Sequence, residues 1–278
     1  KGEYKYTLAV SPLDCMACTL CVRACSTGAL VMTNASSQLE EQRVFDYCVA
    51  KITDKPDLQD VNVRGSQFMR PYLEFSGSCA GCAETSYARL ITQLFGDRMF
   101  VSNATGCSSI WGGPAAVSPY TCNKDGKGVA WSNSLFEDNA EHGLGMYLGH
   151  EAVRKRCIDS AKQIKECGCS ELTLVEAIDA WLGTLDDGIA NAKATEALIP
   201  ILKENKEKAE AAGKDPIHMR QMLENQAYLS KKSFWIFGGD GWAYDIGYGG
   251  LDHVIASGED VNIFVFDTEV YSNTGGQA

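Results

Sequence analysis

Four cysteines near the start of the chain have the spacing of iron–sulfur cluster ligands. Cys15, Cys18, Cys21 and Cys25 follow the pattern C-x2-C-x2-C-x3-C. In this pattern three thiolates bind one cubane, while the fourth cysteine binds the other cluster of a two-cluster pair. A structural zinc site or disulfides are the alternatives, and the spacing favours the cluster. No second run of this kind occurs, so we expect the missing ligands to lie upstream of Lys1.

Three further cysteines form a second group with a less specific spacing. Cys79 and Cys82 make a C-x2-C pair, and Cys107 follows later in the chain. The pair alone fits a redox dithiol, half of a zinc site or half of a cluster site. Glu84 begins a predicted helix whose N–H groups and dipole would stabilise anions nearby. We favour a cluster, whose fourth ligand would be Cys122 or a cysteine beyond the end of the chain.

A glycine-rich turn provides the third candidate site. Gly238-Gly239-Asp240-Gly241 follows an apolar run. Glycines let the backbone approach a pyrophosphate closely, and the N–H groups that open the next helix meet its oxygens. Asp240 offers a carboxylate to Mg2+. Gly-Asp-Gly alone is more often an ordinary turn, but here a second apolar run ends just before Thr268. The Thr268 hydroxyl and the Val270 carbonyl would complete the protein ligands of the cation.

The elements that must position these residues alternate between short apolar runs and helical segments, which predicts an α/β layer architecture. We predict buried strands at 99–102, 129–132, 234–237 and 261–266. We predict helices at 84–95, at 139–166 and across 171–228 with a break at Ala212-Gly213. The carboxyl ends of parallel strands meet at one edge of a sheet, where α/β proteins bind ligands. The Asp240 and Thr268 turns should therefore lie side by side.

Composition narrows the classes of function. A hydrophobic fraction of 45% supports a real core, and a net charge of −11 argues against a nucleic-acid surface. The sequence has no run of 18 apolar residues, so we expect no membrane span. Of twelve cysteines, seven fall in the two groups, which indicates metal or cluster ligation in a reducing compartment. The others are expected to be buried or unremarkable thiols: Cys48, Cys122, Cys157, Cys167 and Cys169.

At this point the chain resembles the single-chain pyruvate:ferredoxin oxidoreductases. The resemblance runs through segments 67–71, 77–85, 104–111, 134–141 and 268–277, in the order ferredoxin domain then thiamine-diphosphate domain. It implies that the chain is the C-terminal part of such an enzyme. The implied fold is a parallel-sheet, thiamine-diphosphate-binding α/β domain at 71–278. A linker at 36–70 and part of a small α+β two-cluster ferredoxin-like domain at 1–35 would precede it.

The resemblance also implies an activity, the oxidative decarboxylation of pyruvate to acetyl-CoA and CO2. The cofactors would be thiamine diphosphate, Mg2+ and three [4Fe–4S] clusters in the intact enzyme, with coenzyme A as co-substrate. Electrons would pass to ferredoxin or flavodoxin. The implied enzyme is a cytoplasmic homodimer. The chain would need the remainder of the same enzyme, including a pyrimidine-binding domain, and would be inactive alone.

Individual residues take roles by the same resemblance. One cluster would be held by Cys79, Cys82 and Cys107, with its fourth cysteine past the end of the chain. Magnesium would lie on Asp240, Thr268 and the Val270 carbonyl. Asn273 is expected to be catalytic, in contact with substrate or intermediate. The residues expected to line the thiamine diphosphate are Glu84, Cys107, Gly239, Asp240, Gly241, Trp242, Thr268, Glu269, Val270, Tyr271, Ser272 and Asn273.

Two alternatives stay open at this stage. The first is an enzyme of the same chemistry that acts on another 2-oxoacid, or that feeds NADP through a fused reductase. The second belongs to another class: a non-catalytic iron–sulfur electron-transfer module in which Gly-Asp-Gly is merely a turn. Saturable binding of thiamine diphosphate with Mg2+ would separate the enzyme from the electron carrier.

Overall fold

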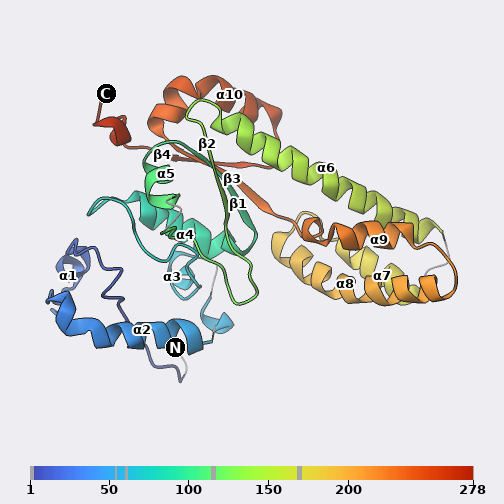
Figure 1. Cartoon of the computed structure of the whole chain (residues 1–278), viewed down its shortest axis with the longest axis horizontal. Coiled ribbons are helices and arrows are strands. Elements are labelled where there is room, and N and C mark those ends of the chain that lie inside the picture. The colour runs from blue at the N-terminus through green and yellow to red at the C-terminus, as the bar shows by residue number, and fades with distance from the viewer. Residues whose placement is uncertain (1–2, 54, 60–61, 114–116, 168–170, 278) are drawn as a thin grey trace.

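A computed structural model of the chain describes residues 3–53, 55–59, 62–113, 117–167 and 171–277. Within these residues, one parallel sheet has the strand order β2-β1-β3-β4 (Figure 1). The strands are β1 Met99–Ala104, β2 Ala130–Ser134, β3 Ser233–Gly239 and β4 Asn262–Phe266. Each overlaps a strand predicted from the apolar runs. The α/β class with a parallel sheet is therefore confirmed.

The helices surround this sheet and extend beyond it. Two of them, α4 and α6, begin and end where the sequence predicts. Among the described residues, every helix is too short or too polar to cross a lipid bilayer. In chain order the helices are α1 Leu20–Ala24, α2 Leu39–Lys51, α3 Val63–Ser66, α4 Glu84–Phe95, α5 Cys107–Gly112, α6 Asn139–Glu166, α7 Leu172–Leu182, α8 Gly188–Ala211, α9 Ile217–Glu224, the five-residue π-helix η5 Trp242–Ile246, and α10 Tyr248–Ser257.

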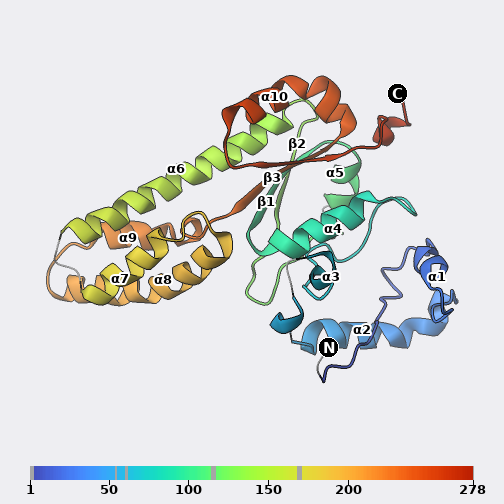
Figure 2. The same cartoon turned by 180° about the vertical axis from the view of Figure 1, so that it is seen from behind.

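Helices cover both faces of the sheet, as Figures 1 and 2 show from opposite sides. On one face, α4 and α5 pack against the strands around Phe237 and Met99, which are fully buried. On the other face, the first part of α6 packs with η5 and α10 around Ile236. Successive strand residues point to opposite faces, so neighbouring Ile236 and Phe237 serve different cores. The result is a three-layer arrangement with the sheet in the middle.

A separate helical core extends from one end of the sheet (Figure 1). The 28 residues of α6 span about 42 Å, so its second half runs past the sheet and packs on α7, α8 and α9. This core is built around Trp181, Leu198 and Leu202, all fully buried. The stretch 171–228 thus holds one more break than predicted. It follows Gly183, and Asp187 then begins α8 by accepting hydrogen bonds from two backbone N–H groups, each 2.9 Å away.

The amino-terminal segment packs little against the rest of the chain. Between residues 3 and 53 it contains α1, α2 and a short 3-10 turn but no strand. None of the side chains of α2 is buried. Ser11, which is 7% exposed, ties the cysteine loop to α2 by donating to Gln42 Oε1 at 2.7 Å. The stretch 36–70, expected to be a linker, therefore contains a 13-residue helix. The domain boundaries themselves stay predictions.

Candidate functional site

The candidate site lies at the carboxyl ends of β1 and β3. The chain leaves β1 toward β2 and leaves β3 toward β4, so the connections diverge in opposite directions at this point of the sheet. Such a switch point is where open α/β sheets bind ligands. A cavity of about 240 Å³ lies there. Its lining residues are Glu84, Thr105, Gly106, Cys107, Ser108, Phe136, Gly239, Asp240, Gly241, Trp242, Tyr271, Ser272, Asn273 and Thr274.

The three predicted magnesium donors come together beside this cavity. Strand register places Gly239 opposite Phe266, so the turns that follow β3 and β4 are neighbours. Asp240, only 6% exposed, accepts hydrogen bonds from the N–H groups of Thr268 at 3.1 Å and Val270 at 2.9 Å. The Thr268 hydroxyl lies 3.3 Å from Asp240 Oδ2 and 3.1 Å from the Val270 carbonyl oxygen. A carboxylate, a hydroxyl and a carbonyl are hard oxygen donors, and this set fits Mg2+.

The glycines of the turn have different roles. A Cβ on Gly238 would lie 2.4 Å from Trp242 Cε3, so this glycine admits the buried indole. A Cβ on Gly241 would lie 2.8 Å from the Tyr271 ring. A Cβ on Gly239, by contrast, would have the Phe266 carbonyl oxygen as its nearest neighbour, at 3.9 Å. Gly239 therefore leaves open space against the backbone, which fits the close approach of a diphosphate.

Glu84 contributes a second carboxylate to the cavity wall. It is the first residue of α4 and is 7% exposed. Burial raises the pKa of its carboxyl, and the nearby charge of Asp240 raises it further. The indole N–H of Trp111 opposes this pKa shift because it donates to Glu84 Oε2 at 2.7 Å. The Glu84 carboxyl is thus a buried acid whose proton affinity depends on one defined hydrogen bond.

Cys107 and the predicted catalytic Asn273 meet at the same cavity. Cys107 begins α5, and its Sγ lies 3.4 Å from Ser272 Oγ and 3.9 Å from Asn273 Oδ1. Burial raises the pKa of the Cys107 thiol. The loop after β4 is closed here by a backbone bond from the Tyr271 N–H to the Gln277 carbonyl at 2.7 Å. This loop therefore joins the cation donors to the cysteine.

The other two cysteines of this group lie within electrostatic range of Cys107. Both Cys79 and Cys82 contribute to the raised pKa of its thiol. In the described part of the chain, no three His, Cys, Asp or Glu side chains converge as ligands of a single metal ion. The thiolates around a cubane bind different irons and need no common point. The donor chemistry fits a cluster, and the ligand assignment stays a prediction.

The first cysteine group occupies a tight, exposed loop. Ala17 and Thr19, on either side of Cys18, have φ of 56° and 65°, a left-handed conformation that turns the chain sharply. The pKa of Cys25 is lowered to about 7, chiefly by the Thr27 hydroxyl 3.5 Å from its sulfur. A thiol that ionises readily is suited to metal ligation. The loop presents thiols to the surface rather than to a core.

The five cysteines outside these groups differ from one another. Cys157 is buried, as expected, whereas Cys48 is partly exposed and Cys122 exposed, both as free thiols. Cys167 is disulfide-bonded, so the expectation of an unremarkable thiol was wrong there. Cys169 lies outside the described residues.

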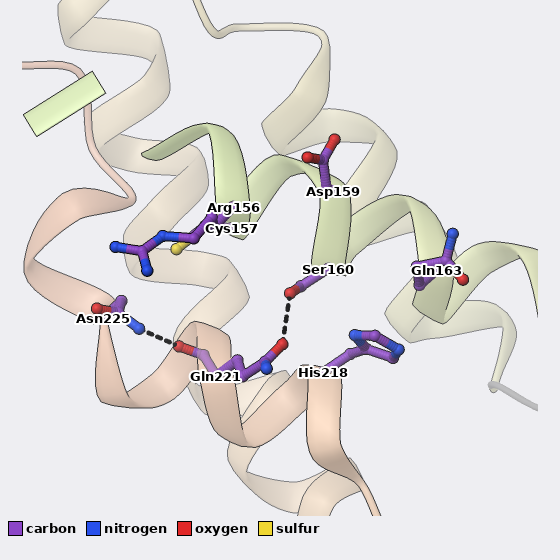
Figure 3. A pocket seen from close by; sticks show the side chains of 8 residues that line it. All are labelled: Arg156, Cys157, Asp159, Ser160, Gln163, His218, Gln221 and Asn225. Carbon is purple, nitrogen blue, oxygen red and sulfur yellow. Dashed lines mark hydrogen bonds between the residues drawn. The ribbon is translucent and has the colours of Figure 1, made fainter. Parts of the chain in front are cut away.

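A second cavity, of about 310 Å³, lies between α6 and α9 (Figure 3). It contains none of the predicted site residues. Three of its polar residues bond to one another: Ser160 donates to Gln221 Oε1 at 3.0 Å, and Asn225 Nδ2 donates to the Gln221 carbonyl at 2.8 Å. His218 Nδ1 also lines this cavity and has no hydrogen-bond partner among the described residues. Because the predicted donors gather at the switch point and none lies here, we place the candidate site at the switch point.

The sequence prediction missed part of the cavity wall. The residues that line it but were not assigned to a site are Thr105, Gly106, Ser108, Phe136 and Thr274. Thr105 directly follows β1 and donates to the Ser134 carbonyl at 2.8 Å, which ties the ends of β1 and β2 together. A threonine and a glycine just after a predicted strand would have indicated this wall.

The fold and the site together define a class: a parallel α/β protein with a glycine-lined ligand cavity at the switch point and oxygen donors that fit a divalent cation. This is an arrangement suited to a diphosphate.

No protein-family model matches the chain, but the chain is similar in sequence to several known proteins. It is 53% identical to a pyruvate-flavodoxin oxidoreductase of Klebsiella pneumoniae, over 99% of this chain and 23% of that protein. It is 46% identical to a pyruvate:ferredoxin oxidoreductase of Moorella thermoacetica, over 99% and 23%. It is 45% identical to a mitochondrial pyruvate dehydrogenase (NADP+) of Euglena gracilis, over 100% and 15%.

The predicted resemblance to the pyruvate:ferredoxin oxidoreductases is thereby confirmed. The chain matches a segment of pyruvate oxidoreductases along nearly its whole length. It spans less than a quarter of the length of these relatives.

Proposed function

We propose that this chain supplies the thiamine-diphosphate site of an enzyme that oxidatively decarboxylates pyruvate to acetyl-CoA and CO2. Coenzyme A is the co-substrate, and electrons pass through [4Fe–4S] clusters to ferredoxin or flavodoxin. The names of the relatives support pyruvate as the substrate and flavodoxin or ferredoxin as the acceptor. The remaining steps rest on the chemistry of the residues around the cavity.

One observation carries the proposal: Asp240, the Thr268 hydroxyl and the Val270 carbonyl meet beside a cavity whose floor at Gly239 is open. Asp240 supplies the charge that attracts the cation, and the two neutral oxygens fix its position. The diphosphate of the cofactor would complete the coordination and lie along the glycine turn.

Thiamine diphosphate, when bound, supplies the nucleophilic carbon and the electron sink for decarboxylation. Glu84 faces the same cavity as a buried carboxyl that can hold or release a proton. Asn273, in the loop after β4, lines the cavity and would present its side-chain amide to the substrate. Cys107, together with Cys79 and Cys82, would hold the cluster nearest the cofactor, and this cluster would supply the first acceptor for the electrons.

A titration of the chain with thiamine diphosphate in the presence and absence of Mg2+ tests this proposal. Trp242 lies in the cavity wall, so tryptophan emission should be quenched saturably and only with both components. Thr268→Val removes one cation donor and should weaken binding roughly 10-fold or more. Thr184→Val removes a hydroxyl in the helical core, which donates to the Ala180 and Trp181 carbonyls and accepts from Asn191 Nδ2, and should leave binding unchanged.

A chain that shows no saturable quench would instead be an electron-transfer module. Equal binding by the wild type and Thr268→Val would refute the cation site while leaving the cavity in place.

The identity of the electron acceptor has a second candidate. The chain is 45% identical to the Euglena gracilis NADP+ enzyme and 46% identical to the Moorella thermoacetica ferredoxin enzyme. These two identities favour neither acceptor over the other. Turnover of the full-length protein with ferredoxin, flavodoxin and NADP+ decides between them, and parallel assays with other 2-oxoacids test the substrate.

The assembly is part of the same proposal. We assign 1–35 to half of a two-cluster ferredoxin-like domain, with clusters on Cys15, Cys18, Cys21 and Cys25, and 71–278 to the cofactor domain. The chain would act within a homodimer and be inactive alone. Iron and sulfide analysis, with sedimentation of the full-length protein, tests the clusters and the dimer.

A further inference from the structure

Two hydrogen bonds cross between the π-helix η5 and the loop that follows β4. Tyr244 of η5 donates to Asp267 Oδ2 of the loop at 2.9 Å. In the opposite sense, Tyr271 of the loop donates to Asp245 Oδ2 of η5. Each segment therefore contributes one tyrosine and one aspartate. We call these four residues the tyrosine–aspartate clamp.

The clamp brackets the candidate cation donors on both sides. Asp267 and Tyr271 stand at the two ends of the short segment that carries Thr268 and Val270. Within this segment Glu269 has φ of 60°, a left-handed conformation that costs energy for a residue with a side chain. The Glu269 N–H donates to Asp267 Oδ1 at 3.1 Å. Asp267 therefore holds this turn with one carboxylate oxygen and accepts the bond from Tyr244 with the other. The loop is thus kept in a conformation that it would not adopt freely.

The π-helix is the other half of the arrangement. It begins two residues after Asp240, and its wide turn is typical of functional sites. The Tyr271 ring packs on Gly241, where a Cβ would lie 2.8 Å from it, and its centroid is 6.3 Å from that of Phe136. Contact and hydrogen bonding together fix Tyr271, and therefore the adjoining Val270 carbonyl, against the Asp240 turn.

Such fixing matters because only one of the three candidate cation donors is a carboxylate. Among the described residues, no three acidic, histidine or cysteine side chains could chelate a cation. Besides Asp240, the protein donors are the neutral oxygens of Thr268 and Val270, which bind weakly unless they are held in place. Preorganised donors lose less conformational freedom on binding.

We propose that Tyr244, Asp245, Asp267 and Tyr271 are positioning residues, which hold the cation donors in their binding geometry before the cation arrives. This inference rests on the proposed cation site. The hydroxyl of each tyrosine makes the bond that crosses between the two segments, so replacement by phenylalanine tests that bond while keeping the ring.

The test is a titration of the whole chain with Mn2+ in the presence of thiamine diphosphate. The electron paramagnetic resonance signal of free Mn2+ reports how much of the cation is bound. Tyr244→Phe and Tyr271→Phe should each weaken Mn2+ binding roughly 2- to 10-fold, and more when combined. The double variant Asp245→Asn/Tyr271→Phe should bind Mn2+ as tightly as Tyr271→Phe alone, because the two substitutions remove the same hydrogen bond. Tyr248→Phe, on an exposed tyrosine of α10, is the matched control and should bind as the wild type does.

A second measurement separates positioning from a general loss of stability. Without cation, hydrogen exchange at the Thr268 and Val270 amides should accelerate in the clamp variants, while the amides of β1 stay protected. The absence of Mn2+ binding in the wild type would sink the cation site itself. Binding by the wild type with unchanged affinity in Tyr244→Phe/Tyr271→Phe would sink the clamp alone.

Discussion

Replacing Trp111 by Phe isolates the one hydrogen bond that restrains the pKa of Glu84. Both side chains are buried, at 3% and 7% exposure, and the indole N–H donates to the carboxylate at 2.7 Å. The phenyl ring keeps most of the apolar contact with Phe266, whose ring centroid is 5.9 Å from that of the indole. The substitution therefore removes chiefly the donor.

The structure gives the size and the pH dependence of the effect. A hydrogen bond to an ionised group contributes about 1.5–3 kcal/mol, and one to a neutral group about 0.5–1.5 kcal/mol. Burial raises the pKa of Glu84, so the folded protein holds this proton more tightly than the unfolded chain does. The free energy of unfolding therefore falls as pH rises from the pKa of Glu84 in the unfolded chain to its raised pKa in the folded protein. Without the indole donor the fall should be deeper by about 1–1.5 kcal/mol.

Urea unfolding at about pH 5 and about pH 8 measures this difference. The loss caused by Trp111→Phe should be greater at the higher pH. Trp131→Phe is the matched control, because within the described residues its buried indole N–H has no hydrogen-bond partner, and its loss should not change with pH in this way. An equal loss at both pH values for Trp111→Phe would refute the assignment of Glu84 as a charged acceptor.

Three further predictions concern the scaffold. Gly143→Ala would bring a Cβ to 2.5 Å from Ile236 Cγ1 and should destabilise the chain by about 1–3 kcal/mol. A Cβ on Gly145, in the same helix, would meet nothing within 4 Å, so Gly145→Ala should stabilise the chain slightly. Thermal unfolding of the two variants measures both effects. Leu198→Ala should cost about 2–5 kcal/mol in the helical core, and hydrogen exchange should increase in α7–α9 more than in the sheet. Asp187→Ala should weaken α8. The N–H groups that Asp187 caps lower the pKa of its carboxyl. Asp187 therefore stabilises α8 fully at pH values above the carboxyl pKa of the unfolded chain, and this stabilisation is lost as pH falls through the lowered pKa of the folded protein. Circular dichroism measured against pH should show this loss of helix content in the wild type and not in the variant.

Sequence patterns determined the parts of this protein that depend on neighbouring residues. Short β-type runs predicted the four strands, the last two of which are continuous apolar runs, and helical spacing ended by Gly96 predicted α4. The order of strand, glycine turn and second strand was enough to expect Asp240 beside Thr268, because adjacent parallel strands end at the same edge of the sheet. The cysteine spacings likewise depend only on local geometry. The break after Gly183 was missed because the helical composition continues on both sides of it.

Only the tertiary structure decided which distant residues meet. The bond from Trp111 to Glu84, the contact of Cys107 with Ser272, and the crossed bonds of Tyr244 and Tyr271 join segments that no local pattern connects. Each depends on how helices and loops pack around the sheet, and packing is a property of side-chain shape over the whole core. The sequence by itself thus determined the kinds of groups available for chemistry, while the fold determined their distances, their burial and therefore their pKa values.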